Sequence, residues 1–173
     1  MGIGYRKSLM AALVSTCVES PVGPLLLAGD ANGLQVLAFA SGRRARVADA
    51  SWAPDSRDVL RPVREELEAY FSGQVRLFTT RVNPQGTPFQ MQVWEALRHI
   101  PYGETISYGA LACRIDKPAA VRAVGAANGA NPIAIIVPCH RVIGADGSLT
   151  GFGGGLAVKK ALLALERGER MLL

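Results

Sequence analysis

The segment Ile135–Arg141 most constrains the fold, because its apolar run ends at a proline that is followed by a thiol and an imidazole. Short apolar runs bounded by breakers are typical of buried strands. Pro138 lacks a backbone N–H and favours an extended residue before it, so strand pairing should end there. The sequence therefore predicts a buried strand that delivers Cys139 and His140 to its end. Taken alone, the segment favours a small buried thiol beside a polar strand end, with no chemistry.

The composition limits the class of protein. A chain of 173 residues can bury a core as one large domain or two small ones, and no stretch approaches the roughly eighteen apolar residues of a membrane span. The odd count of three cysteines argues for a reducing, cytoplasmic environment without a disulfide framework. With two histidines and no CxxC or HxxxH spacing, we expect neither a metal site nor a cofactor. The net charge of +5 permits an anionic partner.

The first half of the chain has the pattern of a small α/β layer. The residues before Leu13 are expected to be a short leader rather than an export signal. Apolar residues at helical spacing predict a helix from near Asp58 to Phe71, where Ser-Gly follows. A proline-glycine turn over 21–24 predicts a hairpin. The strand candidates are Leu13–Ser20, Leu25–Ala28, Leu34–Ala40 and Val75–Val82.

Residues 83–86, Asn-Pro-Gln-Gly, are the expected linker, because turn-forming residues stand together there. The linker divides the chain into an N-terminal domain over 1–82 and a C-terminal domain over 87–173. Thr87–Gln90 is a strong helix start, with a capping threonine, a proline in the first turn and a glutamine that completes a capping box.

Two brief helices are expected over 107–114 and 118–128, at the spacing of a helix-turn-helix. The second is rich in alanine and glycine, so it can approach another surface closely. A nucleic-acid groove and a protein core both reward such an approach, so two core helices fit the pattern as well.

The last segment combines a glycine-rich loop, Gly151–Gly155, with a helix expected over Leu156–Arg167. The loop lacks the Lys-Ser/Thr of a phosphate loop, which argues against nucleotide binding. Glu166 falls near the C-terminal end of the helix, where the macrodipole disfavours a carboxylate. That placement makes sense if Glu166 has a partner, although most such glutamates are solvated.

Taken in order, these motifs resemble those of the O6-alkylguanine-DNA alkyltransferases, or methylated-DNA–protein-cysteine methyltransferases, of the bacterial type. Pro138–Arg141 resembles the family's active-site motif, and Gly151–Gly155 resembles its substrate-binding loop. Tyr102–Tyr108 and Arg122–Gly125 resemble its first motif helix and its recognition helix. The resemblance covers nearly the whole chain. It implies an α+β fold, in which a small N-terminal α/β (ribonuclease H-like) domain precedes a C-terminal winged-helix-like domain with a helix-turn-helix.

The resemblance implies a methylated-DNA–[protein]-cysteine S-methyltransferase that reverses DNA damage directly. It would move the alkyl group of O6-alkylguanine, and of O4-alkylthymine, onto its own Cys139, once and irreversibly. The nucleophile must be a thiolate, whereas a free cysteine has a pKa of about 8.5. His140 would accept the proton through a water, because adjacent strand residues face opposite ways. Glu166 would orient the imidazole, and Tyr108 would protonate the leaving base.

The resemblance also implies a double-stranded DNA partner, bound through its minor groove by a monomer. The damaged base would leave the stack, and Arg122 would fill the vacated place. Asn131 would link the recognition helix to the active-site turn through hydrogen bonds. The other DNA-contacting positions implied are Ser107, Ala120, Ala123 and Gly125. The implied pocket residues are Ala134, Val142, Phe152, Gly153 and Gly154.

The chain departs from some family members at a few positions. Phe152 and Gly153 replace a tyrosine and a serine, so a hydrogen bond to O6 would come from backbone N–H groups. Ala134 stands where mammalian members have a pocket proline, a difference that bears on the tolerance of bulky alkyl groups. Cys113, inside the first motif helix, is expected to pack in the core.

Three other interpretations remain. An alkyltransferase-like protein binds and flips damaged bases without reacting, but such proteins typically replace the cysteine that stands here as Cys139. A helix-turn-helix transcription factor would give that thiol no role. A cysteine hydrolase would need an oxyanion site and would turn over repeatedly.

Overall fold

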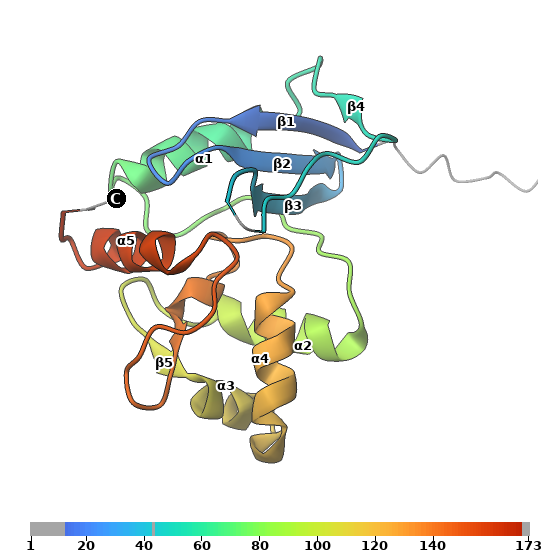
Figure 1. Cartoon of the computed structure of the whole chain (residues 1–173). Coiled ribbons are helices and arrows are strands. Elements are labelled where there is room, and N and C mark those ends of the chain that lie inside the picture. The colour runs from blue at the N-terminus through green and yellow to red at the C-terminus, as the bar shows by residue number, and fades with distance from the viewer. Residues whose placement is uncertain (1–12, 43, 171–173) are drawn as a thin grey trace, which may run out of the picture.

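The computed structural model describes residues 13–42 and 44–170 (Figure 1). The leader expected before Leu13 lies outside the described residues. A four-stranded sheet has the order β3-β2-β1-β4, with β4 parallel to β1 and the other pairs antiparallel. The predicted hairpin is confirmed, and Gly23 has the positive φ of 94° that its turn requires. The strands are β1 (Val14–Val18), β2 (Leu25–Asp30), β3 (Gly33–Phe39) and β4 (Ala53–Pro54).

The helix predicted from near Asp58 is confirmed as α1 (Arg61–Phe71), with a start a few residues later. The carboxylate of Asp55 accepts the backbone N–H groups of Val59 and Leu60 at 2.7 and 2.9 Å. Both N–H groups precede the first helical residue, so Asp55 holds the turn that leads into α1 and does not cap the helix itself.

The strand predicted over Val75–Val82 is wrong. Of this segment only Val82 bridges to the sheet, opposite Leu34. Glu66 on α1 instead accepts the backbone N–H groups of Thr79 and Thr80 at 2.7 and 2.9 Å. Because those backbone donors are bonded to a helix side chain, the segment does not enter the ladder.

The second half is mainly helical, as predicted. The capping box is present: Thr87 Oγ1 accepts the Gln90 N–H at 3.2 Å, and Gln90 Oε1 accepts the Thr87 N–H at 2.9 Å. The expectation that Cys113 packs in the core is wrong, since the thiol lies on the exposed side of its helix. The helices are α2 (Pro88–Arg98), α3 (Tyr108–Arg114), η1 (Pro118–Ala120, a 3₁₀ turn), α4 (Val121–Gly129) and α5 (Leu156–Glu166).

One hydrophobic core joins the two halves of the chain. In Figure 1, α5 lies between the sheet and the group of α2, α3 and α4. β3 is also tied directly to the second half, because Leu37 donates its N–H to Pro132 and accepts that of Ala134, at 2.9 and 2.8 Å. Beside the helices, β5 (Ile106–Ser107) pairs in parallel with β6 (Val142–Ile143).

The α+β fold class is confirmed, with a small sheet layer first and a helical part second. The winged-helix arrangement stays a prediction. Among the described residues, no helix is long and apolar enough to span a bilayer.

Candidate active site

The buried strand predicted before Pro138 is wrong, because the segment forms a turn. Asn131 Nδ2 donates to the carbonyl of Val137 at 2.8 Å, and its Oδ1 accepts the N–H of Ile133 at 3.0 Å. The N–H of Val137 bonds back to Ile133 at 3.0 Å, and Ile135 adopts a left-handed φ of 70°. Backbone groups that would join a neighbouring strand are thus satisfied within the turn.

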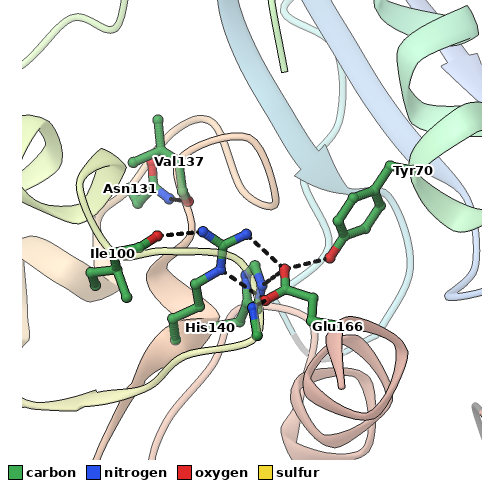
Figure 2. A network of polar contacts seen from close by, with 8 residues as sticks. Tyr70, Ile100, Asn131, Val137, His140 and Glu166 are labelled. Atoms are coloured by element: carbon green, nitrogen blue, oxygen red, sulfur yellow. Dashed lines mark hydrogen bonds and ion pairs between the residues drawn. The ribbon is translucent and has the colours of Figure 1, made fainter. Parts of the chain in front are cut away.

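The turn leads into a 3₁₀ helix, η2 (Cys139–Arg141), which buries the predicted imidazole completely. His140 Nε2 lies 2.8 Å from Oε1 of Glu166 at the end of α5, as Figure 2 shows. Glu166 therefore has a buried partner 26 residues away in the sequence. The fold brings together two of the residues that the sequence singled out for the same chemistry.

Glu166 is the centre of a wider network. Its Oε1 also accepts from the Tyr70 hydroxyl at 2.8 Å, and its Oε2 accepts from Arg141 Nε at 2.8 Å and from the Gly103 N–H at 3.2 Å. Burial alone would raise the pKa of Glu166, but the hydrogen bonds and charges of His140 and Arg141 outweigh burial and hold that pKa far below its usual range. Glu166 is therefore a carboxylate at neutral pH, despite its buried position.

The imidazole of His140 has a second ring nitrogen, Nδ1, that is not bonded to Glu166. Burial lowers the pKa of His140, against the hydrogen bond and charge of Glu166, which raise it. Because the carboxylate accepts from Nε2, we assign the ring hydrogen to that atom, which leaves a lone pair on Nδ1. Within the described part of the chain, Nδ1 is buried and has no hydrogen-bond partner. The ring can therefore accept a proton at Nδ1.

Cys139 lies at the wall of a cavity of about 270 Å³. The cavity is lined from both halves of the chain, by β3 on one side and by the glycine-rich loop on the other. Burial raises the pKa of the Cys139 thiol, and a hydrogen bond with Asn131 and the charge of Lys159 oppose that rise. The thiol therefore needs a base to become a thiolate. Predicted pocket residues that line this cavity are Ala134, Phe152 and Gly153.

A second group of predicted residues lines a neighbouring groove over α4, with a volume of about 640 Å³. Tyr108, Arg122 and Gly125 are in this group, and the Thr150 hydroxyl donates to Tyr108 Oη at 3.2 Å. Arg122 and Ala123 are exposed on α4. The groove and the Cys139 cavity share wall residues, so they are continuous.

Four predicted residues have other places. Ser107 caps α3 by accepting the Ala110 N–H at 3.0 Å, and Ala120 ends η1. Gly154 lies against Phe39, whose ring a Cβ on that glycine would approach to 2.9 Å. The fourth, Val142, is buried in β6.

Lys159 is a buried residue that the sequence reasoning missed. Its Nζ donates to the carbonyls of Val142 and Thr150 at 2.6 and 2.9 Å, so it ties β6 to the glycine-rich loop. Burial lowers the pKa of Lys159, whereas the charge of Cys139 raises it. A signal was present, since Lys159 stands seven residues before Glu166 and so shares its helical face.

Comparison with known proteins identifies the family. The 6-O-methylguanine DNA methyltransferase family matches in two models, the ribonuclease-like domain over residues 13–84 and the DNA binding domain over residues 88–168. A methylated-DNA–protein-cysteine methyltransferase of Methanosarcina acetivorans is 52% identical over 148 residues, which are 86% of this chain and 94% of that protein. The chain belongs to the 6-O-methylguanine DNA methyltransferase family.

Solved structures of this methyltransferase family agree with the assignment. The O6-methylguanine methyltransferase of Mycobacterium tuberculosis matches with a TM-score of 0.82 at 48% identity, over 91% of this chain and 94% of that one. The OGT of the same organism, solved in complex with DNA, matches with a TM-score of 0.82 at 47% identity, over 92% and 94%. The predicted family and activity are confirmed: the chain is a DNA-binding methyltransferase of DNA repair.

Proposed function

We propose that this methyltransferase repairs O6-alkylguanine in DNA by moving the alkyl group to Cys139, in one irreversible turnover per molecule, and that O4-alkylthymine is a second substrate. The observation that carries the proposal is the buried pair of Glu166 and His140, together with the residue before His140 in the chain, Cys139, whose thiol lies at a cavity. A nucleophile, a base and a carboxylate that orients the base are the parts an activated thiol requires.

Proton transfer begins the proposed reaction. A bridging water relays the proton of Cys139 Sγ to the lone pair on His140 Nδ1, and Glu166 stabilises the imidazolium that forms. The thiolate attacks the alkyl carbon, so that a C–S bond forms as the C–O6 bond breaks. The electron pair passes to the guanine, which takes a proton from the hydroxyl of Tyr108. No group restores the thiol, because the alkyl carbon of the thioether would have to expel a thiolate, which is a poor leaving group, and the protein is therefore consumed.

DNA binding is proposed to place the damaged base in the Cys139 cavity. α4 enters the minor groove of duplex DNA with its small residues, and the base leaves the stack. Arg122, exposed at the adjoining groove, occupies the gap. Asn131 connects the end of α4 to the turn that precedes Cys139, through its hydrogen bond to the carbonyl of Val137. The remaining contacts to the DNA come from Ser107, Ala120, Ala123 and Gly125.

The proposed pocket recognises the flipped base largely through backbone groups. The glycine-rich loop supplies N–H groups toward O6, at Phe152, Gly153 and Gly154. The carbonyls of Cys139 and Val142 accept from the guanine amino group. We further propose that the protein acts as a monomer in the cytoplasm, with residues 1–82 and 87–173 as its two domains.

A stoichiometric repair assay tests the proposal. A duplex that carries one O6-methylguanine is mixed with limiting protein, and the repaired fraction is measured over time. We expect repair to stop at one lesion per protein molecule, and Cys139→Ser to abolish it. Tight binding without repair would indicate an alkyltransferase-like protein, and continued turnover would indicate a hydrolase.

The role of Arg122 has its own test. Arg122→Ala should slow repair in duplex DNA much more than it slows the reaction with free O6-benzylguanine, because only the duplex leaves a gap to fill. Equal losses on the two substrates would contradict the stacking role.

A further inference from the structure

The N-terminal half of the chain forms part of the Cys139 cavity. The end of β3, over Leu37–Phe39, lines one wall, and two arginines from the loop that follows, Arg44 and Arg46, line the same cavity. None of the functional residues expected from the sequence lies in this half. Arg44 and Arg46 therefore have no part in the proposed alkyl transfer, although both line the cavity of a DNA-binding protein.

The backbone holds these arginines close to the site. Arg46 donates its N–H to the carbonyl of Phe39 at 2.9 Å, so the loop folds back onto the end of β3. The Phe39 ring packs edge-on against Phe152 of the glycine-rich loop, with ring centroids 5.4 Å apart. Gly154 lies against the same ring and has no room for a side chain there. The loop that carries Arg44 and Arg46 is thus anchored to residues that line the cavity.

Arg44 lies where the cavity meets the α4 groove, since it lines both. In the cavity it shares the wall with Cys139, and in the groove it shares the wall with Tyr108 and Arg122. It is exposed, and neither Arg44 nor Arg46 forms a salt bridge with any carboxylate of the described residues. Its guanidinium is therefore available to an anion from outside the chain.

We propose that Arg44, assisted by Arg46, binds the phosphates that flank the flipped nucleotide, so that the N-terminal half is part of the DNA-binding surface. The inference rests on the proposed function. A nucleotide with its base in the Cys139 cavity and its strand along α4 must cross the junction at which Arg44 lies. A guanidinium matches phosphate with two parallel hydrogen bonds, and pairing with phosphate releases counterions.

Salt-dependent binding tests this proposal. The affinity of Arg44→Ala for a duplex with one O6-methylguanine is measured over a range of salt concentrations, with Cys139→Ser in every protein to prevent repair. We expect the slope of log K against log salt to fall by about 1 for this variant and by about 2 when Arg46→Ala is added. Arg44→Lys should keep the slope, because it keeps the charge. Arg57→Ala is the matched control, since Arg57 is exposed and lines neither the cavity nor the groove.

A second readout separates this inference from the proposed function. With Cys139 intact, Arg44→Ala should lose more of its rate on duplex DNA than on free O6-benzylguanine. A salt slope equal to that of Arg57→Ala would overturn the phosphate contact. Equal losses on duplex and free base would overturn it too, since they would place Arg44 at the base alone. If the protein with every arginine intact repairs no duplex, the proposed function itself fails.

Discussion

Replacing Glu166 by glutamine should destabilise the protein strongly and nearly stop alkyl transfer. The side chain is completely buried and accepts hydrogen bonds from Tyr70, Arg141 and Gly103 in addition to its pairing with His140. Glutamine keeps the shape but leaves the buried guanidinium of Arg141 without a counter-charge. Removing one partner of a buried ion pair costs about 3–5 kcal/mol. For a chain of this length that loss lowers the melting temperature by roughly 6–20 °C.

Tyr70→Phe is the matched control, because it removes one hydrogen bond to the same carboxylate and keeps the ion pair. A hydrogen bond to a charged group contributes about 1.5–3 kcal/mol, so this variant should lose less stability than Glu166→Gln and keep most of its repair rate. Urea unfolding at pH 7 gives the free energies, and single-turnover repair gives the rates. A Glu166→Gln protein as stable as Tyr70→Phe would refute the reasoning, since Glu166 would then not balance a buried charge.

Three further predictions concern the same site. Asn131→Ala should cost about 1–3 kcal/mol in urea unfolding and slow alkyl transfer, because the cysteine turn loses its bridging amide; unchanged stability would contradict this. Lys159→Met should move the titration of the Cys139 thiol to higher pH, measured by the pH dependence of iodoacetamide labelling, because a positive charge is removed; an unshifted profile would show that the charge has no effect. The free energy of unfolding should fall as the pH drops below 6.5, because His140 in the unfolded chain binds a proton that folded His140, with its lowered pKa, does not. It should fall again below pH 4.5, because Glu166 in the unfolded chain then binds a proton that folded Glu166 does not. A flat profile between pH 7 and 4 would contradict those lowered values.

Local signals in the sequence predicted the secondary structure well wherever the deciding contacts are local. The capping box at Thr87 and Gln90 and the hairpin turn at Gly23 involve residues within three positions of each other. The segment before Pro138 forms a turn instead of the predicted strand, for a different reason. Its apolar residues match a strand, but a side chain from Asn131 satisfies the backbone groups that a strand would share.

The parts of the site that the sequence did not reveal depend on long-range packing. Tyr70 reaches Glu166 across 96 residues, and nothing near it in the sequence indicates that its hydroxyl is buried against a carboxylate. Arg44 lies in a segment without periodicity, and only the docking of β3 on the second half brings it to the cavity. Cys139 and His140, by contrast, could be found because their motif is contiguous.

The most direct test of the central claim is the position of the transferred methyl group. The protein is reacted with a duplex that carries one O6-methylguanine, digested, and mapped by mass spectrometry. Of the three cysteines, Cys17 and Cys113 are exposed and Cys139 is buried, so nonspecific alkylation would favour the first two. We predict one methyl group per protein, on Cys139 alone. Methyl groups on the exposed cysteines, or an unmodified Cys139 after the lesion has been repaired, would contradict the claim.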